Sequence, residues 1–222
     1  MEEVTQLGKA LYNVRKAHRL LHDYQTRMLD LAYFIKTKLG MPKFTGKKHF
    51  SNPISSSSQS DKNIWRDMWA WNFLYSYVFE YYLGVKDVNN KKYAISLIQY
   101  SDTGYFDSQN VSSNLPDSFT AEEHCSSKLL IVLEEIDKDG KWNWGDGSSI
   151  ESIVLNKEYG CSSHEKTTLQ LPDGGVQIIY SVPLENMGNE MSVLKELQAF
   201  VDYCNNEGLM AFQGLNLVAQ SE

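Results

Sequence analysis

Four carboxylates lie near the centres or ends of stretches that read as β-strands: Glu80, Asp102, Glu134 and Glu135. Adjacent strands can bring two such acids within reach of one divalent cation, the arrangement that metal-dependent phosphodiester hydrolysis requires. The glutamate-any-lysine order of a common nuclease core is absent after Glu135, and solvent-facing strand positions explain the same acids. Asp102, Glu134 and Glu135 therefore form the alternative catalytic set, that of a metal-dependent hydrolase or nuclease.

Two other patterns are similar to metal sites but fail on their details. His18 and His22 have the i, i+4 spacing that lets two imidazoles share a metal. The arginines and the lysine at positions 15, 16 and 19 would surround such a cation with positive charge. Residues 137–151 gather oxygen ligands as a calcium loop does, but Lys141 stands where the third ligand belongs. The sequence therefore predicts neither a metal site nor a cofactor.

The chain also lacks the patterns of nucleophilic and phosphate chemistry. It has no Gly-x-Ser-x-Gly elbow, and Cys161 and His164 are close in sequence, which is not how a thiolate pair is normally assembled in space. The glycines at 145 and 147 precede serines without the lysine of a P-loop. These absences favour a protein that binds over one that catalyses.

Aromatic residues concentrate in residues 64–83, which hold three of the five tryptophans. Each ring can remove roughly 150–250 Å² of surface from water, so this segment is either core or the wall of a ligand or partner site. Two further tryptophans alternate near residue 143, which places both rings on one face of a strand. The candidate residues for binding a ligand or partner are Trp65, Trp69, Trp71, Tyr75, Tyr77, Trp142 and Trp144.

The N-terminal segment predicts one long helix. Between residues 2 and 39 there is no proline, and apolar residues recur at spacings of three, four and seven over residues 4–35. Gly40 suits a left-handed helix cap, and Pro42 cannot continue the helix. The apolar stripe is longer than one sheet face needs, so we expect this helix to form an antiparallel homodimer. A break of the helix near Gly8 is the alternative.

Alternating or short apolar runs predict the strands of a sheet. Residues 75–83 read as a strand because aromatic and β-branched residues favour a pleated surface, with a continuing helix as the alternative. Gly84 to Asn90 reads as a loop. The other predicted strands are residues 92–101, 129–133, 150–156 and 176–183.

These elements predict an α+β fold. It has an antiparallel sheet of about five strands, flanked on one face by the long N-terminal helix and by a C-terminal helix over residues 193–204. The polar, serine-rich residues 43–60 are predicted to be a mobile loop, because they offer little apolar surface to bury. We expect a single domain over residues 1–222.

Charge and cysteine content narrow the function. A net charge of −7 over 222 residues gives no basic face for phosphates, which argues against nucleic acid as a partner. No apolar stretch is long enough to cross a bilayer, and three widely spaced cysteines are typical of reduced thiols, so we expect a cytoplasmic protein without a membrane partner. We therefore favour a soluble, non-catalytic binding or regulatory protein that holds a small molecule or a protein partner through its aromatic-rich segment.

Overall fold

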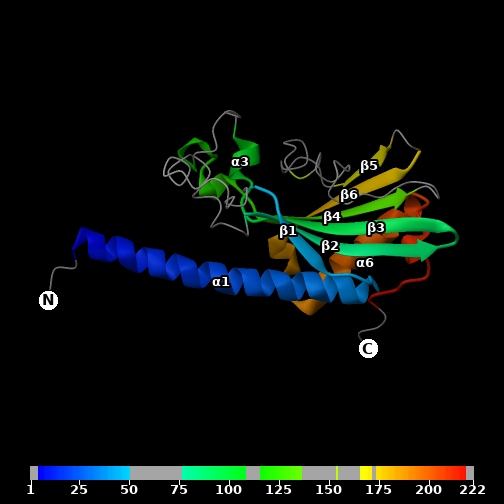
Figure 1. Ribbon diagram of the computed structural model, residues 1–222, viewed down its shortest axis with the longest axis horizontal. Helices are drawn as coiled ribbons and strands as arrows, with labels where there is room; N and C mark the ends of the chain where they lie inside the picture. Colours follow the sequence, from blue (N-terminus) through cyan, green and yellow to red (C-terminus); the bar gives the residue numbers. More distant parts are fainter. Residues whose placement is uncertain are drawn as a thin grey trace, which may run out of the picture.

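The computed structural model describes residues 5–50, 77–108, 116–136, 154, 166–171 and 174–218. Within these residues, six antiparallel strands form one sheet in the order β1-β2-β3-β4-β6-β5 (Figure 1). The strands are β1 (Thr45–Lys48), β2 (Val78–Val88), β3 (Lys91–Tyr100), β4 (Lys128–Ile136), β5 (Lys166–Gln170) and β6 (Val176–Pro183). With an N-terminal and a C-terminal helix beside the sheet, the predicted α+β fold is confirmed.

The helices differ greatly in length. They are α1 (Gln6–Lys38), α3 (Gly104–Asp107) and α6 (Glu190–Asn206), with the 3-10 turns η2 (Pro116–Ser118), η3 (Glu122–His124), η4 (Leu184–Met187) and η5 (Met210–Phe212). In the part of the chain that the structure describes, no helix has both the length and the apolar character that spanning a bilayer demands.

α1 is continuous through Gly8, so the predicted alternative of a break there does not occur. The Thr5 side chain accepts a hydrogen bond from the Gly8 backbone N–H at 3.1 Å and caps the first turn. At the other end, Gly40 adopts a φ of 65° and the Met41 N–H donates to the Lys36 carbonyl at 3.0 Å. The predicted helix and its stop are confirmed.

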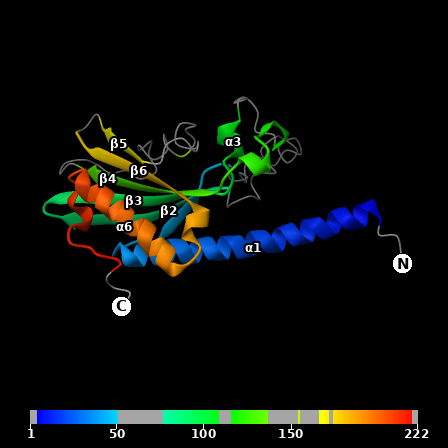
Figure 2. The ribbon, with the colours of Figure 1, turned by 180° about the vertical axis from the view of Figure 1, so that it is seen from behind.

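Only the C-terminal half of α1 packs on the sheet. Met28, Ala32 and Ile35 are buried, whereas all side chains from residue 9 to residue 23 are exposed. Figures 1 and 2 show this N-terminal half projecting away from the sheet. We call residues 6–22 the arm.

β2 and β3 form a hairpin that Asn89 and Asn90 close. Their φ values of 52° and 64° are those of a type I′ turn, which matches the twist of the two strands. The strand predicted at 75–83 is confirmed from Val78 onward. The predicted loop from Gly84 to Asn90 is wrong, because β2 continues to Val88 past a bulge at Gly84.

β1 replaces part of the predicted mobile loop. Its register runs from Thr45 opposite Tyr82 to Lys48 opposite Phe79, and the following Phe50 is buried. The loop prediction is therefore wrong for residues 45–50, and residues 51–60 lie outside the described residues. Backbone pairing with β2, rather than apolar alternation, makes this short lysine-bearing segment a strand.

The remaining strand predictions fall into three groups. The strands predicted at 92–101, 129–133 and 176–183 are confirmed as β3, β4 and β6. β5 is an edge strand that was not predicted from the sequence, because its residues are mostly polar. The strand predicted at 150–156 lies outside the described residues except for Val154.

Each face of the sheet is covered by its own core. The larger core joins one face to α1 and α6 through residues such as Ile35, Leu97 and Phe200, so the two helices share a face as predicted. The second core lies on the opposite face and includes Ile98 and Tyr100. The alternation of side chains along β3 thus places its residues in both cores.

Replacing Gly84 by alanine is expected to lower the free energy of unfolding by about 1–3 kcal/mol. The residue has a φ of 96°, and an added Cβ would lie 3.0 Å from the Lys43 Cβ and 3.1 Å from the Pro42 Cγ. Gly174→Ala is the matched control, because Gly174 has a φ of 88° with nothing within 4 Å of such a Cβ. Urea unfolding should show the larger loss at Gly84, and equal losses would contradict close packing at the bulge.

Candidate functional site

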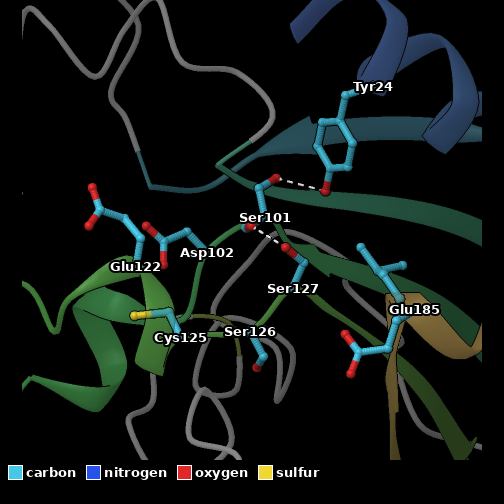
Figure 3. Close-up of a pocket in the computed structure, with 9 residues that line it drawn as sticks. Tyr24, Ser101, Asp102, Glu122, Cys125, Ser126, Ser127 and Glu185 are labelled. Atoms are coloured by element: carbon cyan, nitrogen blue, oxygen red, sulfur yellow. Dashed lines mark hydrogen bonds between the residues drawn. The ribbon is translucent and has the colours of Figure 1, made fainter. Parts of the chain in front are cut away.

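A pocket opens where α1, the end of β3 and the segment before β4 meet. Its volume is about 510 Å³. We call it the acidic pocket, and its lining residues are Tyr24, Ser101, Asp102, Glu122, Cys125, Ser126, Ser127, Leu184 and Glu185 (Figure 3).

The register of the sheet brings these separate segments together. Tyr100, the last residue of β3, lies opposite Lys128, the first residue of β4. Residues 101–102 and 126–127 therefore leave the same end of the sheet side by side. Tyr24 reaches the pocket from α1, and Glu185 reaches it from η4, directly after β6.

Ser101 is the centre of a hydrogen-bond network that joins α1 to the sheet. The Tyr24 hydroxyl and the Gln99 Nε2 both donate to the Ser101 hydroxyl oxygen, at 3.1 and 3.0 Å. The Ser127 hydroxyl donates to the Ser101 carbonyl at 2.6 Å (Figure 3). Behind them, the buried Tyr81 hydroxyl donates to the Gln99 Oε1 at 2.7 Å. This network holds one wall of the pocket in place.

Three carboxylates make the pocket acidic. Figure 3 shows Asp102 and Glu122 on one side and Glu185 on the opposite side. The Asp102 Oδ1 accepts a hydrogen bond from the Gly104 backbone N–H at 2.7 Å, which fixes that carboxylate. Among the described residues, neither Glu122 nor Glu185 forms an ion pair. The described lining contains no lysine or arginine to neutralise them.

The pocket belongs to a segment of one charge sign. Residues 101–127 contain five aspartates and glutamates and no lysine or arginine. We call their described parts, 101–108 and 116–127, the acidic lobe. Among the residues that line the pocket, only Asp102 was predicted from the sequence, and the residues missed are Tyr24, Ser101, Glu122, Cys125, Ser126, Ser127, Leu184 and Glu185. A count of charges along the chain is the signal that points to this segment.

The thiol and the phenol of the pocket stay protonated near neutral pH. Burial, with smaller contributions from the Asp102 and Asp107 carboxylates, raises the pKa of Cys125 to about 11. Burial also raises the pKa of Tyr24. Because the thiolate is the nucleophilic form of cysteine, Cys125 is poorly suited to attack a substrate. The pocket is better suited to accept hydrogen bonds from a cation.

The structure does not bring the alternative catalytic set together. Asp102 lies at the acidic pocket, whereas Glu134 pairs with Ala94 at the far end of β3. Glu134 and Glu135 are consecutive strand residues, so their side chains point to opposite faces of the sheet. Among the described residues, no group of three His, Cys, Asp or Glu side chains is arranged to hold a metal ion.

The strand glutamates have partners within the fold. The Glu134 Oε2 accepts a hydrogen bond from the Gln177 Nε2 at 2.7 Å, and the Glu135 Oε1 accepts one from the Lys91 Nζ at 2.5 Å. The Glu80 carboxylate, 3% exposed, bonds the His49 Nε2 and the Ser96 hydroxyl, both at 2.7 Å. These contacts link neighbouring strands of the sheet.

Tyr77 is the one predicted aromatic binding residue within the described part of the chain. It is 8% exposed, and its ring centroid lies 4.4 Å from that of Phe50 and 6.2 Å from that of Phe119. It therefore belongs to the second core rather than to an open wall. Outside the described residues lie Trp65, Trp69, Trp71, Tyr75, Trp142 and Trp144.

Comparison with protein families identifies one relationship. A family model described as PM0109 matches residues 4–213, a range that includes the arm, the acidic pocket and α6. Comparison with curated proteins and with solved structures finds no match.

Proposed function

The chain belongs to the PM0109 family, and we propose that it is a non-catalytic binding protein whose acidic pocket receives a cationic group. One observation carries this proposal: a cavity of about 510 Å³ is lined by three carboxylates and, within the described residues, by no lysine or arginine. A charged ligand of opposite sign would relieve the repulsion among these acids and would find hydrogen-bond acceptors already in place.

The lining indicates which cations fit. Ammonium and guanidinium groups are donors only, and the pocket offers carboxylate oxygens on two sides with serine hydroxyl oxygens between them (Figure 3). The volume is in the range of small-ligand sites. The ligand class is therefore an amine or guanidine, either as a small molecule or as a lysine or arginine side chain of a protein partner.

The rival function, a metal-dependent hydrolase or nuclease, has less support. Its three predicted carboxylates lie at two ends and on two faces of the sheet. The one thiol of the described pocket lining is protonated at neutral pH, as its raised pKa implies. Binding without catalysis is the function that fits both facts.

Two finer expectations remain proposals. The exposed apolar residues of the arm support self-association through α1, as the sequence predicts. Cys125 and Cys204 are both free thiols, which supports the predicted cytoplasmic location because such thiols persist in a reducing compartment.

The proposed function predicts that agmatine, a small molecule with a guanidinium and an amine, stabilises the protein against heat. At a concentration tenfold above its dissociation constant, the expected gain is about 1.4 kcal/mol. The gain should shrink as salt is added, because the contact is electrostatic. A thermal unfolding series with increasing agmatine measures it.

Matched variants locate the site. Glu122→Gln combined with Glu185→Gln removes two pocket charges and should abolish the stabilisation by agmatine. Glu123→Gln, next to Glu122 but outside the lining, should leave it intact. If agmatine has no effect on the unmodified chain at protein concentrations low enough to keep it monomeric, or acts equally on the double variant, the proposed site is wrong.

A further inference from the structure

α1 carries one apolar seam that is covered in one half and open in the other. Apolar residues at positions 7, 11, 14, 21, 28, 32 and 35 fall on the alternating three- and four-residue positions of a coiled coil, with the polar His18 and Gln25 at the two remaining positions. The later positions are buried against the sheet. In the arm, Leu7, Leu11 and Val14 are 68%, 48% and 52% exposed. The open half is thus the direct continuation of an interface that the helix already forms.

The arm is also basic. Residues 6–22 contain Lys9, Arg15, Lys16 and Arg19 and no acidic residue, in a chain whose net charge is −7. The acidic lobe has the opposite composition, and it meets α1 at Tyr24, just after the arm ends. Among the described residues, no ion pair joins the arm to the lobe of the same chain.

We propose that the arms of two copies of this chain pair antiparallel along their open seams, and that the basic face of each arm contacts the acidic lobe and pocket of the other copy. The inference rests on the proposed function, because it names Lys9 of the partner subunit as a cation that the acidic pocket receives.

The spacing of residues along α1 supports this arrangement. In an antiparallel pair that sets Leu11 against Leu21 of the partner subunit, Leu7 lies against Gln25 of the partner subunit. That position is next to the partner subunit's Tyr24, which lines the partner's pocket. The tip of each arm therefore ends at the pocket of the other copy.

The positions of Lys9 and Lys16 on the arm are compatible with a contact to the acidic lobe of the other copy. Lys9 and Lys16 are seven residues apart and lie on the helix face opposite the seam. When the two seams face each other, the face of each arm that carries Lys9 and Lys16 points away from the helix of the partner subunit. The acidic lobe lies on the same side of α1 as the sheet, which is the side of the seam (Figure 1). The two lysines therefore face the lobe.

Both contacts are needed for a stable dimer. The arm is about 26 Å long at 1.5 Å per residue, and isolated helical pairing of such length is marginal in water. The contact between arm and lobe occurs twice in a two-fold dimer, and it is made between oppositely charged surfaces. A second copy thus covers the apolar seam and neutralises the acidic pocket at once.

Reciprocal charge reversal tests the proposal by sedimentation equilibrium of the full chain. One variant carries Lys9→Glu and Lys16→Glu, and the other carries Glu122→Lys and Glu185→Lys. Each variant alone should show a dimer dissociation constant raised by about tenfold or more, because arm and lobe then repel each other. An equimolar mixture should regain the dimer mass, because the reversed arm meets the reversed pocket. Circular dichroism checks that both variants are folded.

Three outcomes would overturn the inference. They are a monomeric unmodified chain at every concentration, a dimer that neither reversal weakens, and a mixture that stays monomeric. A monomer whose arm instead binds vesicles of anionic phosphatidylserine would assign the arm to a membrane surface. If agmatine still stabilises such a monomer through Glu122 and Glu185, the proposed function stands and only the second copy is excluded.

Discussion

Replacing Glu80 by alanine is expected to lower the free energy of unfolding by about 3–5 kcal/mol. The carboxylate is buried on β2 and bonds the His49 Nε2 and the Ser96 hydroxyl, both at 2.7 Å. Its loss would leave those two buried polar groups without this acceptor, in a place where burial limits compensation by water. It would also remove a side-chain link between β2 and the end of β1, because His49 directly follows β1.

Urea unfolding measures this loss, and an exposed ion pair provides the control. Glu190 lies 3.7 Å from the Lys38 Nζ with its side chain 65% exposed, so Glu190→Ala should cost no more than about 1 kcal/mol. A change at Glu80 as small as the one at Glu190 would contradict a buried polar link between β1, β2 and β3.

Phe200→Ala is expected to cost about 3–5 kcal/mol of stability, the range for removing a buried aromatic side chain. Phe200 is fully buried on α6, and its ring centroid lies 5.7 Å from that of Tyr180 and 5.8 Å from that of Phe212. The change would open a cavity where α6 packs on β6 and η5.

Met191 on the same helix is the matched control, because it is exposed. Met191→Ala should change the free energy of unfolding by less than about 0.5 kcal/mol in the same denaturation experiment. Equal effects at the two positions would mean that α6 is not anchored through its aromatic face.

Periodicity accounts for the elements that sequence reasoning predicts. The apolar repeat of α1 recurs along most of the helix, and Gly40 provides the conformation that ends it. β4 reads as a central strand because its apolar residues are buried on both faces, between β3 and β6. The loop prediction at Gly84 fails because glycine is common both in β-bulges and in loops. Only the pairing of β2 with β3 distinguishes the two.

The edge strands and the acidic pocket have no comparable local signal. β1 and β5 are strands because of the neighbour they pair with, which an isolated polar sequence does not specify. The pocket draws its lining from α1, the two ends of the acidic lobe and η4, which lie far apart in the sequence. Asp102 can be identified beforehand as an acid at a strand end, but its neighbours Glu122 and Glu185 depend on the tertiary fold.

The strand order also sets the order in which the chain closes its loops during folding. β2 and β3 are joined by two residues, β3 and β4 by residues 101–127, and β4 and β6 by residues 137–175. Because the entropy cost of closing a loop rises with its length, the β2–β3 hairpin forms most readily and the β4–β6 pair least readily. The wall of the pocket that holds Asp102 and Ser127 thus assembles when β4 docks, and Glu185 arrives only with β6. The lining of the acidic pocket is therefore complete only once β6 has paired with β4.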